Sequence, residues 1–268
     1  MKGSNFRVLR RVVRRLPFLR RSPFLLRLAL GEVSRTEVLT WIAIHRRCSC
    51  YLEIGVASGK NFLNVPVSSK IGVDPCAPGP YTERAIESGA RYFQCTSDQF
   101  FSELAPQILA QTPPDLVFID GLHTYSQALM DLKNAYRFAK TGAVIVLHDC
   151  NPPTPASAIP ACSYSHAKQM NPAGWDGAWC GDVWKVIAQI RQVFPQLNCR
   201  VVDCDYGLGV IVKKCETSID TLNVDESVLQ LPYEYLAQSR KKILGLVSPL
   251  WVLRLGMKGK THGNEVWS

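Results

Sequence analysis

Apolar and polar positions alternate along residues 35–215 in a way that predicts strands and helices in turn. Short apolar runs, typical of buried strands, stand between longer stretches whose apolar positions have helical spacing. The predicted strands are Cys50–Ile54, Lys70–Val73, Arg91–Gln94, Leu116–Ile119, Ala143–Leu147, Arg200–Asp203 and Gly209–Val212. The predicted helices are Thr36–His45, Tyr81–Gly89, Asp98–Ala110, Thr124–Ala139 and Asp182–Val193.

This alternation predicts an α/β fold, because strands that follow helices in turn form a mostly parallel sheet covered on both faces. We therefore expect a Rossmann-like, seven-stranded sheet within a domain spanning residues 35–215. Residues 152–180 show neither helical nor strand periodicity, which predicts a long loop. A long loop in a compact domain usually has a function. We expect this segment to be an active-site loop. The nearby Trp175, Trp179 and Trp184 could stack on a sugar ring or cover an edge of the core.

The two ends of the chain differ in composition from the body. The arm, residues 1–34, carries Lys2 and eight arginines before its first acid, Glu32, while the whole chain has a net charge of +9. The body is therefore close to neutral. Apolar residues of the arm have near-helical spacing from Phe6 to Leu16, which predicts an amphipathic segment. The C-terminal extension, residues 216–268, contains an apolar run, Ile243–Leu253, that is too short to span a bilayer.

Three interpretations of these basic ends remain open. They could lie on an anionic membrane surface, pack on the domain or on another subunit of a homo-oligomer, or bind nucleic acid. Nucleic acid is the least favoured, because no RNA-binding module accompanies the arm. Arginines interrupt every candidate apolar core of a signal peptide, and the ten cysteines form no paired CxxC units. We expect a reduced, cytoplasmic protein, and among the three interpretations a peripheral position at the membrane is slightly favoured over packing.

Polar residues cluster where the first five predicted strands end. The residues in question are Glu53 and Gly55, Asp74, Ser97 and Asp98, Asp120 and His123, and finally His148, Asp149 and Asn151. The carboxyl ends of parallel strands meet at one edge of a sheet, and ligands bind there at the switch in strand order. We therefore expect these side chains to converge on one crevice.

Gly55 and Gly59 flank a turn from strand to helix. Without Cβ atoms, backbone N–H groups at such a turn can approach a ligand closely. Asp74, about 20 residues further on, is placed to accept hydrogen bonds from a ribose diol. A crevice lined with acids repels a diphosphate and favours a cation, which Glu53 beside the turn would attract. These features together predict S-adenosylmethionine, which carries positive charge on its sulfur and its ammonium group.

Six segments resemble the class I S-adenosylmethionine-dependent methyltransferases. They are LEIGVASGKNF, IGVDP, TSDQFF, FIDGLHTYSQALMDL, VIVLHDCNPP and GDVWK…DCDYGLGVI. More narrowly, they are similar to the macrocin-type sugar O-methyltransferases found among polysaccharide and natural-product genes. The resemblance covers roughly residues 48–213. Its most specific part is IDGLHTY followed by HDCNP.

The resemblance implies roles for individual residues. Cofactor contacts are implied at Glu53, Gly55, Ser58, Gly59 and Asp74, with Ser97 and Asp98 at the adenine. Asp120 and Asp149 fall where metal-dependent relatives hold a divalent ion. Those relatives place an acid or amide directly after the second aspartate, whereas here Cys150 intervenes, which leaves Asn151 or His148 as third ligand. Asp98 and Asp120 also precede predicted helices, and each could simply cap one.

Transfer of a methyl group to an alcohol requires in-line positioning and removal of the hydroxyl proton. Mg²⁺ would bind the hydroxyl oxygen and lower its pKa. His123, at the start of a predicted helix, is the expected base, because an imidazole titrates near neutral pH. We expect an O-methyltransferase acting on a hydroxyl of a glycan, glycolipid or related small metabolite. The alternatives are a non-catalytic S-adenosylmethionine-binding assembly or regulatory protein, and an RNA methyltransferase that uses the arginine-rich arm.

Overall fold

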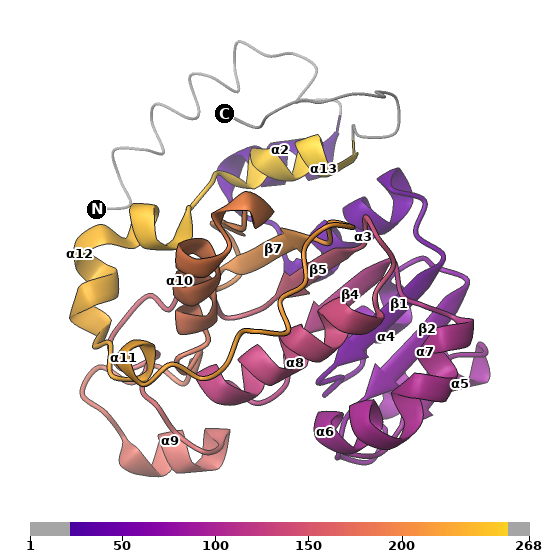
Figure 1. Ribbon diagram of the computed structural model, residues 1–268, viewed down its shortest axis with the longest axis horizontal. Coiled ribbons are helices and arrows are strands. Elements are labelled where there is room, and N and C mark those ends of the chain that lie inside the picture. Colours follow the sequence, from indigo (N-terminus) through magenta and orange to yellow (C-terminus); the bar gives the residue numbers. More distant parts are fainter. Residues whose placement is uncertain (1–21, 257–268) are drawn as a thin grey trace.

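A computed structural model describes residues 22–256 and contains one seven-stranded sheet (Figure 1). Its order is β3-β2-β1-β4-β5-β7-β6. β1 to β5 are parallel, and β7 runs antiparallel to both β5 and β6. The strands are β1 (Cys50–Ile54), β2 (Ser69–Val73), β3 (Arg91–Phe93), β4 (Leu116–Ile119), β5 (Val144–Leu147), β6 (Arg200–Val202) and β7 (Leu208–Val212). The predicted Rossmann-like sheet is confirmed, and each strand begins and ends within one residue of its predicted position.

Helices cover both faces of the sheet, as predicted, and each face has its own cluster of buried apolar side chains. On one face lie α2 (Pro23–Leu30), α3 (Arg35–His45), α4 (Lys60–Asn64), α5 (Pro80–Glu87), the 3-10 helix η4 (Pro249–Trp251) and α13 (Val252–Gly256). On the other lie α6 (Ser97–Gln99), the π-helix η2 (Phe100–Leu104), α7 (Ala105–Gln111), α8 (Tyr125–Phe138), α10 (Trp184–Val193), the 3-10 helix η3 (Pro195–Leu197), α11 (Glu226–Leu229) and α12 (Tyr233–Leu244).

Side chains at the helix starts explain where two helices near the strand ends begin. Ser34 and Glu37 form a capping box at α3, in which each side chain hydrogen-bonds the backbone of the other residue. The hydroxyl of Thr124 accepts a hydrogen bond from the backbone N–H of Gln127 at the start of α8. These caps set the positions of Arg35 and His123, which stand beside them at the carboxyl edge of the sheet.

The described parts of the two basic ends pack on the domain. Leu28 of α2 and Leu255 of α13 are buried in the same apolar cluster, and Val247 forms a parallel bridge with Val202 of β6. For residues 22–31 and 243–256 the packing interpretation is therefore observed. The predicted amphipathic segment Phe6–Leu16 lies outside the described residues. No helix between residues 22 and 256 is long and apolar enough to cross a membrane.

The segment between β5 and α10 contains a helix that the sequence pattern does not predict, α9 (Tyr164–Met170). α9 lies at the opposite end of the molecule from α2 and α13 (Figure 1). A smaller apolar cluster holds this segment together, formed by Ala161, Ala167 and Trp179 with Ile159 and Trp175 packed against them. Trp184, by contrast, is buried in the main core.

Candidate active site

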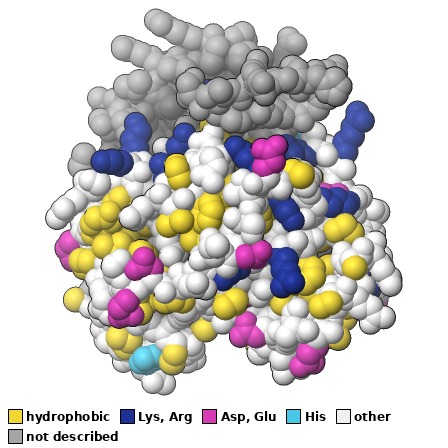
Figure 2. Space-filling model, in the orientation of Figure 1, with side chains coloured by type: hydrophobic (Ala, Val, Ile, Leu, Met, Phe, Trp, Pro, Cys, Tyr) yellow, Lys and Arg dark blue, Asp and Glu magenta, His cyan; other side chains and the backbone are white. Residues whose placement is uncertain are grey.

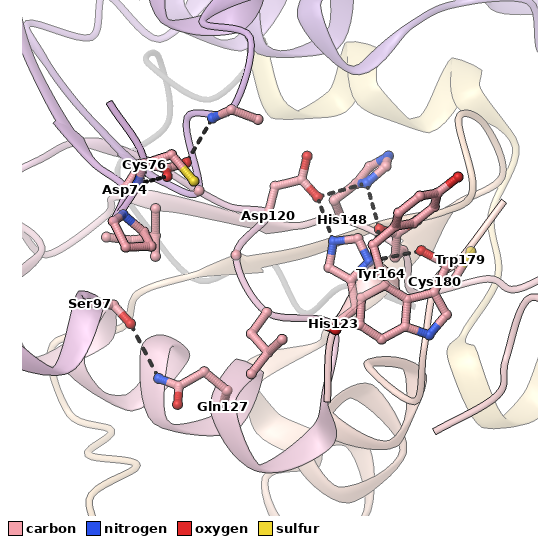
Figure 3. A pocket seen from close by; sticks show the side chains of 18 of the residues that line it. Asp74, Cys76, Ser97, Asp120, His123, Gln127, His148, Tyr164, Trp179 and Cys180 are labelled. Carbon is pink, nitrogen blue, oxygen red and sulfur yellow. Dashed lines mark hydrogen bonds and ion pairs between the residues drawn. The ribbon is translucent and has the colours of Figure 1, made fainter. Parts of the chain in front are cut away.

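A cavity of about 960 Å³ lies beyond the carboxyl ends of the parallel strands. Figure 3 shows its interior, with side chains from the ends of β2, β4 and β5 and from the loop before α10. Of the predicted site residues, the structure brings together Gly55, Asp74, Ser97, Asp98, Asp120, His123 and Asp149. Glu53, Ser58, Gly59 and Asn151 do not line this cavity. The loop expected over the site contributes Tyr164 and Trp179 to the lining.

Two carboxylates and two imidazoles form the polar centre of the cavity. Figure 3 shows three of these groups, Asp120, His123 and His148, side by side. His123 lies between the aspartates, with Nε2 3.4 Å from Asp120 Oδ1 and Nδ1 3.3 Å from Asp149 Oδ2. His148 Nδ1 is 3.0 Å from each of the same two oxygens. Asp149 has a φ of 58°, a left-handed conformation that costs energy for a residue other than glycine. Such strain is common at functional sites, and here it turns Asp149 toward the histidines.

The hydrogen bonds of His148 determine which ring nitrogen carries the proton. Burial lowers the pKa of His148 and the neighbouring carboxylates of Asp120 and Asp149 raise it well above its usual value, which alone would favour a charged ring; the contact at Nε2 decides against that charge. Nε2 lies 3.0 Å from Arg35 Nη1, and a guanidinium can only donate. That contact therefore fits the neutral ring, with its one proton on Nδ1 and shared between the two carboxylates. His148 thus holds Asp120 and Asp149 together.

The loop before α10 fixes the ring of His123. His123 Nδ1 lies 2.8 Å from the carbonyl oxygen of Trp179, which can only accept, so Nδ1 carries a proton. The Trp179 ring stacks on the imidazole with centroids 5.0 Å apart. Burial opposes a charge on His123, but hydrogen bonding to Asp120 and the charge of Asp149 raise its pKa. Nε2 is left as the nitrogen that can exchange a proton with a ligand.

The other end of the cavity presents groups suited to an adenosine. The Asp74 carboxylate accepts hydrogen bonds of 2.8 Å from the backbone N–H groups of Ala57 and Cys76, which fix its orientation. Gln127 Nε2 lies 3.2 Å from Ser97 Oγ and 3.1 Å from Asp98 Oδ1. The side chains of α6 and α8 therefore meet at this end of the cavity, as the dashed contact between Ser97 and Gln127 shows (Figure 3).

Glu53 does not have the role expected of it. Its side chain is fully buried in β1, where it accepts a 2.9 Å hydrogen bond from the Tyr51 hydroxyl and a 3.4 Å hydrogen bond from Asn61 Nδ2. Burial raises the pKa of Glu53 to about 8, although these two donors favour the carboxylate. The side chain is therefore neutral at pH 7 and separated from the cavity, so it does not attract the cation directly.

The two glycines of the turn are required by the chain's own packing. Gly55 has a φ of +81°, and a Cβ atom there would collide with the carbonyl oxygen of Asp120. Gly59 has a φ of +78°, and its Cβ would collide with Thr82 at the start of α5. Close approach of a ligand is not the reason that side chains are excluded at these two positions. Ser58 is exposed outside the cavity.

Asn151 is not brought to the carboxylate pair. Its Nδ2 donates to Asp203 Oδ1 at 3.0 Å, and its Oδ1 accepts from Arg240 Nη1 of α12. Arg240 also donates to the carbonyl of Pro152, at 2.8 Å. Asn151 therefore connects the chain after β5 to the C-terminal extension. In this arrangement the predicted ligand Asn151 is held by these hydrogen bonds rather than beside Asp120 and Asp149.

A divalent ion would find suitable donors at Asp120 and Asp149, beside His123. One ligand atom from each of these residues lies within 4.8 Å of the others. Two carboxylates supply the oxygen donors that Mg²⁺ prefers, and they would need only water and substrate to complete its coordination. Cys150 is buried with its thiol on the carbonyls of Leu147 and His148, so it does not replace the missing acid or amide.

Several residues of the cavity are not among the predicted site residues. They are Arg35, Cys76, Gln127, Tyr164 and Tyr206. Each lies on a segment whose return to the strand ends depends on tertiary packing. Tyr206 offers a partial signal, because its φ of 61° belongs to the turn DYG, where aspartate and glycine favour left-handed backbone.

A comparison with protein families covers the strands whose ends line the cavity. A family described as a methyltransferase domain matches residues 52–150, which run from β1 to the end of β5. No curated protein matches the chain. Among solved structures, the chain is similar to the S-adenosylhomocysteine-bound methyltransferase PaMTH1 of Podospora anserina, with 16% identity over 69% of this chain and 81% of that one and a TM-score of 0.48.

Two further structures are similar in the same way. The O-methyltransferase TomG of Streptomyces achromogenes, in complex with S-adenosylmethionine, has 16% identity over 68% of this chain and 81% of that one, with a TM-score of 0.43. Cofactor-bound Rv0187 from MTB has 16% identity over 72% of this chain and 91% of that one, with a TM-score of 0.45. Residues 52–150, which include most of β1 and all of β2 to β5, therefore match a methyltransferase domain.

Proposed function

We propose that this methyltransferase transfers its methyl group to a hydroxyl oxygen of a small acceptor. The observation that carries the proposal is the group formed by Asp120, His123, His148 and Asp149 beside a cavity end suited to an adenosine. A hydroxyl is a weak nucleophile while it keeps its proton, so a site that methylates oxygen needs a base or a metal ion next to the methyl group. This group of side chains can supply both.

The cofactor would lie across the strand ends with its adenosine toward α6. Asp74 retains lone pairs for the ribose hydroxyls beyond the two backbone N–H groups that orient it. Ser97, Asp98 and Gln127 offer both donors and acceptors to the adenine edge. The sulfonium would then lie near Asp120, whose negative charge favours it. Burial disfavours that charge, but His148 and His123 hold the pKa of Asp120 well below its usual range.

His123 would remove the proton of the acceptor hydroxyl through Nε2. The carbonyl of Trp179 keeps the other ring nitrogen protonated, and the charge that forms on the ring is balanced by Asp120 and Asp149. Asp120 and Asp149 would hold Mg²⁺, which lowers the pKa of a bound hydroxyl. His148, with its proton shared between these carboxylates, keeps their spacing fixed.

The acceptor side of the cavity favours a ring with polar and apolar faces. Tyr164, Trp179 and Tyr206 line it together with Leu122, and all except Trp179 are well exposed. Aromatic side chains bind the apolar faces of sugar rings as well as planar ligands. These walls support a glycan, a glycolipid or a related hydroxylated metabolite as the acceptor.

The charge of the chain supports an anionic membrane surface as a partner. Residues 1–21 hold eight of the lysines and arginines and no acid, while residues 22–256 carry 21 cationic and 21 acidic side chains, so the charge of +9 belongs to the ends. On the face shown in Figure 2, lysine and arginine side chains gather toward the end where α2 and α13 lie. Apolar residues alternate with these arginines, as in interfacial segments. Co-sedimentation with phosphatidylserine vesicles, lost on deletion of residues 1–21, would support this partner; binding to RNA alone would exclude it.

The function is tested by incubating the protein with methyl-labelled S-adenosylmethionine and fractionated glycans, lipids and small metabolites. We expect label in one acceptor class, lost in Asp149→Asn while binding of S-adenosylhomocysteine is retained. Addition of EDTA distinguishes the ion from the base, because a Mg²⁺-assisted reaction stops and one driven by His123 alone continues. Transfer to protein or RNA but to no small acceptor would contradict the proposal.

A further inference from the structure

The cavity contains one guanidinium among its aspartates. Asp74, Asp98, Asp120 and Asp149 line it, and among residues 22–256 Arg35 is the only lysine or arginine that does. S-adenosylmethionine carries a carboxylate on its methionine part, and this anion needs a cation within an acidic cavity. We propose that Arg35 binds the α-carboxylate of the cofactor. The inference rests on the proposed binding of S-adenosylmethionine and assigns a residue outside the family match to it.

The position of Arg35 along the sheet fits this role. Asp74 follows β2 and Asp120 follows β4, with β1 between them in the sheet. Two strand spacings separate these positions, about 10 Å. An adenosine held at Asp74 therefore extends its amino-acid tail past Gly55 toward Asp120. Arg35 reaches the same place from α3, with Nε 3.7 Å from Asp120 Oδ2.

The guanidinium of Arg35 retains a donor for a ligand. Nη1 contacts His148 Nε2 at 3.0 Å and Asp205 Oδ1 at 3.5 Å. Nη2 makes no hydrogen bond to any group within residues 22–256, and about a third of the side chain, 34%, is exposed. A guanidinium presents five N–H donors in a planar fork that matches a carboxylate. The free edge of Arg35 can therefore accommodate one.

The side chain of Arg35 can be removed without removing the start of its helix. The backbone N–H of Arg35 donates to Asp205 Oδ2 at 2.6 Å, and the capping box is formed by Ser34 and Glu37. None of these bonds involves the guanidinium. Arg27 provides a matched control, because it lies on α2 and its side chain contacts Glu37 at 2.7 Å and the carbonyl of Glu32 but not the cavity.

Two ligands that differ in the amino-acid part test the proposal. S-adenosylhomocysteine has the carboxylate and methylthioadenosine lacks it. Calorimetry would measure the binding of each ligand to the wild type, Arg35→Ala, Arg35→Lys and Arg27→Ala. A hydrogen bond between charged groups corresponds to a change in Kd of about 10- to 100-fold. We expect Arg35→Ala to weaken the binding of S-adenosylhomocysteine by this factor and the binding of methylthioadenosine by less than about twofold.

The control variants and the wild type separate the other outcomes. Arg35→Lys keeps the charge and loses the fork, so we expect a smaller loss, and Arg27→Ala should bind both ligands as the wild type does. Equal losses for the two ligands in Arg35→Ala, or no loss for either, would overturn the assignment and leave the proposed function intact. Failure of the wild type to bind either ligand would overturn the proposed function together with this inference.

Discussion

Replacing Glu53 by Gln should change how the stability of the protein depends on pH. Glu53 is fully buried in β1, and burial raises its pKa from 4.5 to about 8. Glutamine has nearly the same shape, remains neutral at every pH, and can hydrogen-bond Tyr51 and Asn61. The substitution therefore removes a titratable group from the core with little change in packing.

The direction and the magnitude of this pH effect on stability follow from the pKa values of Glu53 in the unfolded and folded states. Between pH 4.5 and about 8 the folded protein keeps a proton on Glu53 that the unfolded chain releases. Stability must then fall as the pH rises through this interval, because proton release favours the unfolded state. At about 1.4 kcal/mol per pH unit, the whole interval corresponds to on the order of 5 kcal/mol. Glu53→Gln should lack this loss, so it should match the wild type near pH 5 and exceed its stability at pH 9.

Urea denaturation of both proteins at pH 5, 7 and 9 measures the effect. The exposed Glu83 gives a matched control, since Glu83→Gln removes the same charge at the surface and should leave the pH dependence unchanged. Parallel stability curves for wild type and Glu53→Gln would refute the reasoning. They would mean that Glu53 is ionised in the folded state and could act on the charge of the cofactor.

Three further substitutions have expected outcomes. Lys185→Met removes one partner of a buried ion pair, in which Lys185 Nζ lies 3.2 Å from Asp182 Oδ2. The free energy of unfolding measured in urea should fall by about 3 to 5 kcal/mol, and most of this loss should be recovered when Asp182→Asn is added. Gly55→Ala should lower the free energy of unfolding by about 2 to 4 kcal/mol and displace the end of β4, so that S-adenosylhomocysteine also binds more weakly. Gly79→Ala, whose Cβ meets open space, should change neither stability nor binding. Trp179→Phe keeps the backbone carbonyl that orients His123, so methyl transfer should fall far less than in His123→Ala; an equal fall would assign the role to the indole ring.

The sheet could be predicted because its signal is local. Short apolar runs with turn residues between them define each strand, and the polar residues after β2, β4 and β5 meet wherever those strands are parallel. Asp74, Asp120 and Asp149 therefore come together as expected. Neither the direction of β7 nor its insertion between β5 and β6 can be read from such runs, because pairing is set by contacts distant in the sequence.

The expectations that differ from the structure concern the direction of a side chain and the groups that it contacts. Glu53 and Asn151 stand at the right edge of the sheet, yet one turns into the core and the other toward α12. Glycine at position 55 signals a close approach, but the approaching group is the backbone of Asp120. Arg35 precedes the family match, and only the packing of α3 on the sheet brings it to the cavity. Sequence spacing gives an edge and a register, but not these contacts.

A crystal structure of the protein with S-adenosylhomocysteine tests the account most directly. We expect the ribose hydroxyls on Asp74, the adenine beside Ser97 and Asp98, the sulfur near Asp120, and the carboxylate of the amino-acid part on Arg35. Nucleoside density on any other surface, or bound with its sulfur remote from Asp120 and His123, would contradict the claim that these strand ends form the methyl-transfer site.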